Sequence, residues 1–179
     1  GIPGTIGGAL RMNASCYEQS ISDKLVEVKV MDRYGKIFTL SKKQLNFSYR
    51  QVSIPQNHIF LEASFKINKI EQNRIKNRMK RIKLKREISQ PIKNRTGGST
   101  FKNTVDKMAW KLIDEVGYRG IKVGSAKISE KHANFIINVL PGNSLNIEIL
   151  GEKIVKKVFE KKGIKLEWEI ERVGNFVKI

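Results

Sequence analysis

The chain has 179 residues, 40% of them hydrophobic, and 35 Lys and Arg against 17 Asp and Glu give a formal net charge of +18. This length holds one domain or two small ones, and the apolar fraction is large enough for a buried core, which excludes a wholly disordered protein. The positive charge favours an anionic partner, such as nucleic acid, a membrane surface or a phosphorylated small molecule, without choosing among them.

The cysteine and histidine content excludes two classes of site. Cys16 is the single cysteine, so no internal disulfide can form, and neither His58 nor His132 stands in a cluster of metal ligands, so we expect no metal. No apolar run reaches the roughly 20 residues that span a bilayer, and the first residues do not resemble a signal peptide. We therefore expect a cytoplasmic protein without a membrane partner.

In chain order, a glycine-rich turn over residues 1–9 comes first, and three predicted strands follow. Apolar residues alternate with charged ones over residues 24–31, and the turn at 32–35 leads into residues 37–40, which predicts a hairpin. Period-two alternation over residues 59–67 predicts another strand with one buried face.

A basic helix is predicted over residues 70–86. Ile75, Met79 and Ile82 are spaced four and three apart among eight basic residues, which is typical of a helix with one apolar face. The basic residues are compatible with a nucleic-acid footprint, but no aromatic side chain lies among them for base stacking, so a solvated face is the favoured interpretation.

Ser89-Gln90-Pro91 ends this helix, because a proline disfavours helical backbone in the residue before it. We therefore predict a domain boundary near residue 88. The predicted organisation is a first domain, a connecting helix and a second domain, over residues 1–69, 70–88 and 89–179.

The second domain is predicted to mix helices with strands, which indicates the α+β class. The expected elements, in order, are a helix at 104–116 with Thr104 as its N-cap, a strand at 135–139, a helix at 147–163 that ends at Gly163, and a last strand at 164–170.

Several polar groups are candidates for chemistry. Arg50 could make bidentate contacts to a carboxylate or phosphate. Ser99 follows two glycines near the start of a predicted helix, a favourable place for anions. Glu169 is one of three glutamates on the polar face of the last predicted strand, and periodicity cannot single it out. Four glycines within residues 1–9 let backbone approach an anion or a flat ring, although a tight structural turn is an equal interpretation.

Short motifs follow one another along the whole chain: Gly1-Ile2-Pro3-Gly4-Thr5-Ile6-Gly7-Gly8-Ala9, Met12-Asn13-Ala14, Tyr49-Arg50, Gln90-Pro91, Gly98-Ser99-Thr100-Phe101-Lys102-Asn103, Ser129-Glu130-Lys131-His132-Ala133-Asn134-Phe135 and Leu166-Glu167-Trp168-Glu169-Ile170. In this order they resemble the UDP-N-acetylenolpyruvoylglucosamine reductase family of bacterial flavoenzymes. The resemblance implies the later part of an FAD-binding domain of the PCMH type, followed by a small α+β substrate-binding domain.

The resemblance also implies a reaction. NADPH would reduce bound FAD, and the flavin would reduce the double bond of UDP-N-acetylglucosamine enolpyruvate to give UDP-N-acetylmuramate for peptidoglycan synthesis. Arg50 and Glu169 would stabilise the enol intermediate, and Ser99 would deliver a proton. Three more residues match positions near the substrate: Lys102, Asn103 and His132. The residues implied at the flavin are Gly1, Ile2, Pro3, Gly4, Thr5, Gly7, Gly8 and Ala9.

This sequence departs from the family pattern at several places. Ser15-Cys16-Tyr17-Glu18 stands where the family usually has Gly-Ala-Tyr-Gly, Thr104 replaces a proline, and one residue is added after Arg50. The family's FAD domain also has an upstream glycine-rich portion that this sequence lacks. We therefore expect the chain alone to bind FAD poorly, with a separate N-terminal fragment as a candidate partner. Two alternatives stay open: a basic nucleic-acid-binding module, and an inactive remnant that still binds the UDP-sugar.

Overall fold

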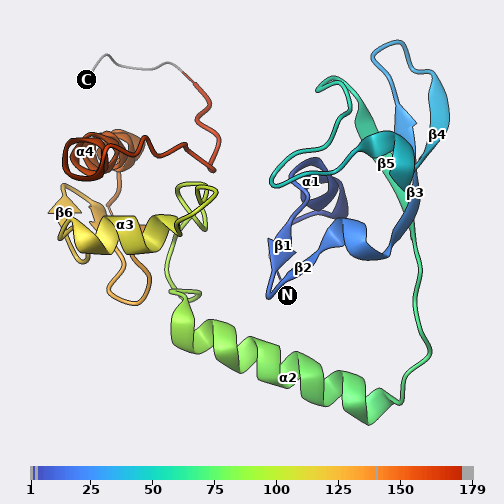
Figure 1. Ribbon diagram of the computed structural model, residues 1–179, viewed down its shortest axis with the longest axis horizontal. Helices are drawn as coiled ribbons and strands as arrows, with labels where there is room; N and C mark the ends of the chain where they lie inside the picture. The colour runs from blue at the N-terminus through green and yellow to red at the C-terminus, as the bar shows by residue number, and fades with distance from the viewer. Residues whose placement is uncertain (1, 3, 140, 175–179) are drawn as a thin grey trace. The chain divides into compact units, whose positions relative to one another are not determined.

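The computed structural model describes residues 2, 4–139 and 141–174. The chain divides into two compact units, Gly1–Asn77 and Arg78–Ile179, and the division falls inside one long helix (Figure 1). Both helices and antiparallel sheets are present, which confirms the α+β class. The domain limits predicted at residues 69 and 88 stay a prediction.

A three-stranded antiparallel sheet forms the centre of the first unit. Strand β3 (Leu25–Met31) lies between β4 (Ile37–Ser41) and β5 (Ile59–Phe65). Val28 and Val30 of β3 are fully buried, because alternate side chains of a strand face the same side of its sheet. The predicted hairpin and the third strand are therefore confirmed.

The glycine-rich start does not form the turn that we predicted throughout it. Residues Ile6–Arg11 form helix α1, and the Thr5 hydroxyl caps it by accepting the N–H of Gly8 at 3.1 Å. Leu10 of α1 is buried in the core of the first unit. This burial offsets the low helix propensity of glycine, which costs about 1 kcal/mol per residue relative to alanine.

Four short elements complete the described part of the first unit. They are β1 (Ser15–Cys16), β2 (Gln19–Ser20) and the 3₁₀ turns η1 (Ile21–Lys24) and η2 (Lys42–Leu45).

Helix α2 (Gln72–Ser89) confirms the basic helix, but the predicted apolar face is wrong. No residue of α2 is buried, and Ile75 and Met79 are 44% and 65% exposed. Ile75, Met79 and Ile82 do share one side of the helix at 100° per residue, but the exposure of Ile75 and Met79 shows that no other surface of the described chain covers this side, and Leu84 lies opposite Ile75.

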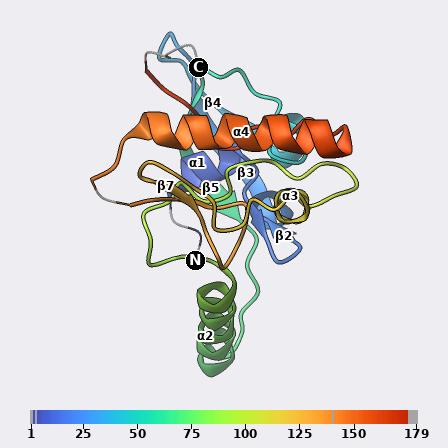
Figure 2. The same cartoon turned by 90° about the vertical axis from the view of Figure 1, so that its left-hand side faces the viewer.

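The second unit packs helices on a small antiparallel sheet. The sheet consists of β6 (Lys122–Val123), β7 (Ala126–Ile128) and β8 (Ile136–Asn138) in that order. Helix α4 (Ser144–Lys162) contacts β6, β7 and α3 (Ala109–Glu115), and Figure 2 shows α4 along its length. The shared core contains these buried residues: Phe101, Ala109, Leu112, Ile113, Ala126, Ile128, Ala133, Ile136, Leu150, Ile154, Val158 and Leu166.

Two predictions for the second unit are corrected. Thr104 is not a helix cap: its hydroxyl accepts the N–H of Lys107 at 3.0 Å in a turn, and the helix begins only at Ala109. Residues 164–170 do not form a strand. Leu166 is buried, as the alternation predicted. However, the segment pairs only through the isolated bridge between Trp168 and Phe101, because the extended segment around Phe101 is only a few residues long. The helix ending at Gly163 is confirmed, with this glycine in the left-handed conformation at φ 68°.

Candidate active site

In the first unit, Arg50 is held by its neighbours. Its backbone has φ 55°, in the left-handed region that few non-glycine residues adopt. Its Nη1 donates to the Ser15 hydroxyl at 2.7 Å, and its guanidinium lies 4.9 Å from the centre of the Tyr49 ring. The guanidinium is therefore directed by specific contacts rather than extended freely into solvent.

Asn13 lies close to the loop that carries Arg50, and its residue type alone did not predict a role in a binding site. Its Nδ2 donates to the Ser48 carbonyl oxygen at 2.9 Å. Its Oδ1 is buried and has no hydrogen-bond partner among the described residues. A buried acceptor without a donor is costly, so this oxygen is a candidate for accepting an N–H or O–H from a bound molecule.

The glycine-rich segment divides into an open part and a packed part. Gly1 and Pro3 lie outside the described residues. Gly4 has φ 134°, and a Cβ built on it meets nothing within 4 Å. Gly7 instead lies against the sheet, where a Cβ would be 3.8 Å from Phe60 Cβ. The backbone near Gly4 is thus accessible to a flat or anionic group, whereas Gly7 serves helix packing.

The remaining predicted flavin residues in the described part of the chain differ in exposure. Ile2 and Thr5 are exposed, and so is Gly8, while Ala9 is half-buried. The open glycine at 4 and the unpartnered acceptor of Asn13 fit a planar group that carries N–H donors. The residues present in the first unit are therefore compatible with part of a flavin site.

In the second unit, residues 99–102 lie between two other segments. On one side Ser99 forms a bridge with Phe135. On the other side the N–H of Lys102 donates to the Glu167 carbonyl oxygen, and the N–H of Glu169 donates to the Thr100 carbonyl oxygen, both at 2.8 Å. The bridge and these hydrogen bonds place Ser99, Lys102 and Glu169 on adjacent extended segments.

Asn134 holds this arrangement together, and sequence reasoning missed its role. The Asn134 side chain is 3% exposed, accepts the N–H of Phe101 at 3.0 Å and donates to its carbonyl oxygen at 2.8 Å. A buried asparagine can satisfy both backbone groups of one residue in this way. The signal was in the motif around His132 and Asn134, but only the fold identifies Phe101 as the partner.

His132 lies at the edge of the core. Its ring is 4.8 Å from the Phe135 ring and 6.1 Å from the Trp110 ring, and its Nδ1 accepts the N–H of Asn134 at 3.3 Å. Burial, and secondarily the nearby charge of Arg119, lowers the pKa of His132 below its usual value. The imidazole is therefore neutral at pH 7 and keeps Nε2–H as its donor.

Lys102 and Asn103 have structural contacts of their own. The Lys102 ammonium lies 3.4 Å from the Glu167 carboxylate, in a pair that is largely exposed on the Glu side. Asn103 Oδ1 accepts the N–H of Ala109 at 3.0 Å, which satisfies the free backbone at the start of α3. Asn103 thus positions α3, whatever else it contacts.

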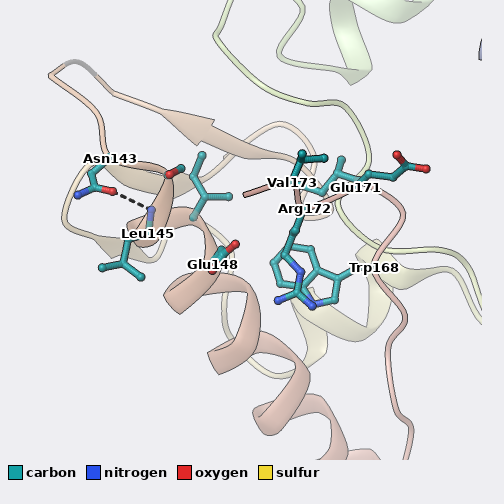
Figure 3. A pocket seen from close by; sticks show the side chains of 10 residues that line it. Asn143, Leu145, Glu148, Trp168, Glu171, Arg172 and Val173 are labelled. Atoms are coloured by element: carbon teal, nitrogen blue, oxygen red, sulfur yellow. Dashed lines mark hydrogen bonds between the residues drawn. The ribbon is translucent and has the colours of Figure 1, made fainter. Parts of the chain in front are cut away.

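A cavity of about 520 Å³ lies in the second unit beside the start of α4 (Figure 3). It is lined by Asn143, Leu145, Glu148, Trp168 and Arg172 among others, and the Arg172 guanidinium lies over the Trp168 ring at 4.7 Å. None of the residues predicted for catalysis or substrate binding lines it. The cavity therefore does not coincide with the predicted chemistry.

Two further classes of feature are absent from residues 2, 4–139 and 141–174. No group of three or more acidic, histidine or cysteine side chains there could hold a metal ion. Within the same residues, no helix is both long enough and apolar enough to cross a lipid bilayer.

Comparison with known proteins shows what this chain is similar to. Residues 90–173 match the model of the UDP-N-acetylenolpyruvoylglucosamine reductase C-terminal domain. UDP-N-acetylenolpyruvoylglucosamine reductase of Rickettsia massiliae (strain Mtu5) is 46% identical over 97% of this chain, and that of Paramagnetospirillum magneticum is 47% identical over the same share. The crystal structure of UDP-N-acetylenolpyruvylglucosamine reductase from Thermus caldophilus matches 94% of the chain at 33% identity, with a TM-score of 0.81.

The matches extend through both units of this chain but not through the whole of the relatives. The chain spans 59% of the Rickettsia massiliae protein, 57% of the Paramagnetospirillum magneticum protein and 61% of the Thermus caldophilus chain. The chain is similar to UDP-N-acetylenolpyruvoylglucosamine reductases over almost its whole length, and it spans about three fifths of theirs.

Proposed function

We propose that the chain carries the catalytic residues of a reductase that converts UDP-N-acetylglucosamine enolpyruvate to UDP-N-acetylmuramate in peptidoglycan precursor synthesis. The observation that carries this proposal is the hydrogen-bonded array of the second unit, which places Ser99 and Glu169 on adjacent segments. The relatives that match almost the whole of this chain are named as UDP-N-acetylenolpyruvoylglucosamine reductases, which supports the proposal.

FAD, reduced by NADPH, would supply the hydride for this reaction. In the first unit, the open backbone at Gly4 and the acceptor Oδ1 of Asn13 are the groups that would contact the flavin. The excess of basic residues, with a net charge of +18, favours the approach of UDP-sugar and NADPH, which are both multiply anionic.

The chain's own residues would act on the charge that develops in the substrate. Addition of hydride to one vinyl carbon leaves an enolate whose negative charge extends to the neighbouring carboxylate. The fixed positive charge of Arg50 would stabilise that charge, and Glu169 would assist in stabilising the enol. The Ser99 hydroxyl would deliver a proton to the other vinyl carbon, a step open to a weak acid only because the carbon is strongly basic.

Flavin absorbance and turnover test this proposal. The purified chain is measured alone and after mixing with the part of the Rickettsia massiliae protein that it does not cover. We expect flavin to be retained in the mixture, with NADPH oxidation that depends on the enolpyruvyl sugar. The Ser99→Ala variant should lose at least about 100-fold in rate, while Ser144→Ala, an exposed serine at the start of α4, should not.

The opposite outcomes are equally defined. Flavin retained without sugar-dependent NADPH oxidation contradicts the proposed reaction. No flavin in either arm favours a remnant, and calorimetric titration with the UDP-sugar then decides whether binding survives without turnover. No heat even at millimolar sugar excludes that alternative.

A further inference from the structure

The three-stranded sheet of the first unit has an inner face that is covered. On this face Val30 of β3 lies opposite both Phe38 of β4 and Phe60 of β5 in the strand register. Val30 is fully buried, and the two phenylalanines pack against the same core. Directly opposite residues of an antiparallel pair have their side chains on the same face, so this row of three belongs to the inner face.

The outer face of the sheet begins with a second apolar row. Met31, the next residue of β3, lies opposite both Ile37 and Ile59. Successive side chains of a strand point to opposite faces, so this row faces away from Val30 and the core. Ile37 and Ile59 are each 55% exposed. We call Met31, Ile37 and Ile59 the outer apolar row.

The rest of the outer face is polar. The neighbouring row consists of Lys29, Thr39 and Glu62, and the Lys29 ammonium forms an ion pair with the Glu62 carboxylate at 2.8 Å. The row after it is also polar: Glu27, Ser41 and Ser64. An antiparallel sheet that faces water normally has polar side chains on that face, and only the outer apolar row departs from this pattern. Exposed apolar side chains beside a polar rim are typical of a surface that another polypeptide covers.

The length of the relatives indicates which polypeptide that is. The chain spans 59% of the Rickettsia massiliae protein and 61% of the Thermus caldophilus chain, so each relative contains further polypeptide. The Thermus caldophilus structure still matches 94% of this chain with a TM-score of 0.81, so its further polypeptide lies outside the shared fold. A second copy of this chain is a poorer occupant, because a net charge of +18 on each copy opposes self-association.

We infer that the outer apolar row is a docking surface for the part of a reductase that this chain does not span, whether that part belongs to the same polypeptide or to a separate one. The row offers aliphatic and thioether side chains, so it fits an apolar segment of that part. The inference takes only the identity of the partner from the proposed function. It concerns assembly, and it goes beyond the reaction that the assembled protein would perform.

Co-purification and sedimentation velocity test the docking without flavin or turnover. The chain is co-expressed with the tagged part of the Rickettsia massiliae protein that it does not cover. The test variant combines Ile37→Gln with Ile59→Gln, and the matched control combines Thr39→Gln with Ser64→Gln on the same two strands and the same face. Neither variant changes the net charge, so general electrostatic attraction stays equal. We expect the Kd to rise at least about tenfold in the test variant and less than about twofold in the control.

Each other outcome decides against the inference. An equal Kd in the test and control variants overturns it, and so does a wild-type chain that forms no complex. A wild-type chain that sediments as a dimer, and as a monomer in the test variant, assigns the row to a second copy instead. The single variants Ile37→Gln and Ile59→Gln carry the test if the double variant does not keep the wild-type circular dichroism spectrum.

The same complex separates this inference from the proposed function. A complex that depends on the outer apolar row but shows no sugar-dependent NADPH oxidation contradicts the proposed reaction and leaves the docking surface standing. A complex with full activity whose Kd does not change in the test variant supports the reaction and overturns the docking surface.

Discussion

The side-chain amide of Asn134 makes both backbone hydrogen bonds of Phe101, as donor to its carbonyl oxygen and as acceptor from its N–H. This pair of contacts joins the segment that carries Ser99 and Lys102 to the segment that follows His132. Phe101 is fully buried and lies 5.0 Å from the Trp168 ring, so the same residue also connects to the segment that carries Glu169. Asn134 therefore has a structural role at the centre of the candidate site.

The first prediction concerns Asn134→Ala. Removing the amide leaves a buried N–H and a buried C=O of Phe101 without partners, and each such group costs about 1–3 kcal/mol. We expect the free energy of unfolding to fall by about 2–4 kcal/mol, measured by urea denaturation. The control is Asn94→Ala, at an exposed asparagine, which should change stability by less than about 0.5 kcal/mol. Equal stability of the two variants would contradict the role of Asn134.

A second prediction concerns the glycine in the middle of α4. A Cβ on Gly151 would overlap the indole of Trp168, so this helix passes the tryptophan more closely than any other residue allows. Gly151→Ala should raise intrinsic helix propensity yet lower the free energy of unfolding by about 1–3 kcal/mol, because overpacking outweighs propensity.

Trp168 fluorescence reports the displacement directly. Its Nε1 donates to the Glu152 carboxylate at 3.0 Å, and a shifted ring would lose that bond. We expect an altered emission maximum in Gly151→Ala but not in Lys153→Ala, at an exposed position on the same helix. A more stable Gly151→Ala variant with unchanged emission would show that the close contact is not a constraint.

A third prediction concerns pH. The pKa of His132 is lowered in the folded chain, chiefly by burial, so the unfolded chain binds a proton more readily. The contribution of His132 to the free energy of unfolding is complete above about pH 6.5, the pKa of histidine in the unfolded chain. It is lost as the pH falls from there through the lower pKa of the folded chain. His132→Gln should flatten the stability profile in that window, measured by urea denaturation at several pH values.

The stability lost in His132→Gln relative to wild type should be larger at pH 8 than at pH 5. An NMR titration that places the His132 pKa at or above about 6.5 would refute the burial argument.

A fourth prediction tests the nucleic-acid alternative through α2. This helix is exposed along its length, carries no aromatic side chain, and has basic residues on more than one side. We expect duplex DNA to bind only through general charge, with affinity that falls steeply with salt. Changing Arg74, Arg78, Lys80 and Arg81 to Gln should weaken binding no more than changing Lys153, Lys156, Lys161 and Lys165 to Gln, which removes the same charge from α4 and the segment that follows it.

The measurement is fluorescence anisotropy with a labelled duplex between about 50 and 200 mM salt. A loss of binding confined to the α2 variant would establish a specific nucleic-acid surface on that helix. It would then favour the binding-module alternative over a solvated helix.

Particular residues show why some predictions from the sequence were correct and others were not. Val28 and Val30 alternate within a strand that pairs on both sides, so their period-two pattern was a direct record of burial. The pattern of residues 164–170 was equally regular, and Leu166 is buried, but ladder formation also needs a partner of matching length. That length was not visible in the sequence of the segment itself.

Helix α2 forms as predicted, but its apolar side chains are not buried as predicted. Ile75, Met79 and Ile82 have helical spacing, and the helix exists, yet spacing alone does not provide a surface against which those side chains can pack. Thr104 is likewise a good N-cap by residue type, but its hydroxyl closes a local turn and leaves Asn103 to satisfy the start of α3.

The sequence by itself indicated the family that this chain resembles, through motifs in a fixed order, and it predicted most of the helices and strands, through periodicity and caps. These are local properties, recorded in neighbouring residues. Only the tertiary structure decided that Asn134 satisfies the backbone of Phe101 and that Ser15 contacts the Arg50 guanidinium. Each of these contacts joins residues that are 33 or 35 positions apart, so it depends on how the chain returns on itself.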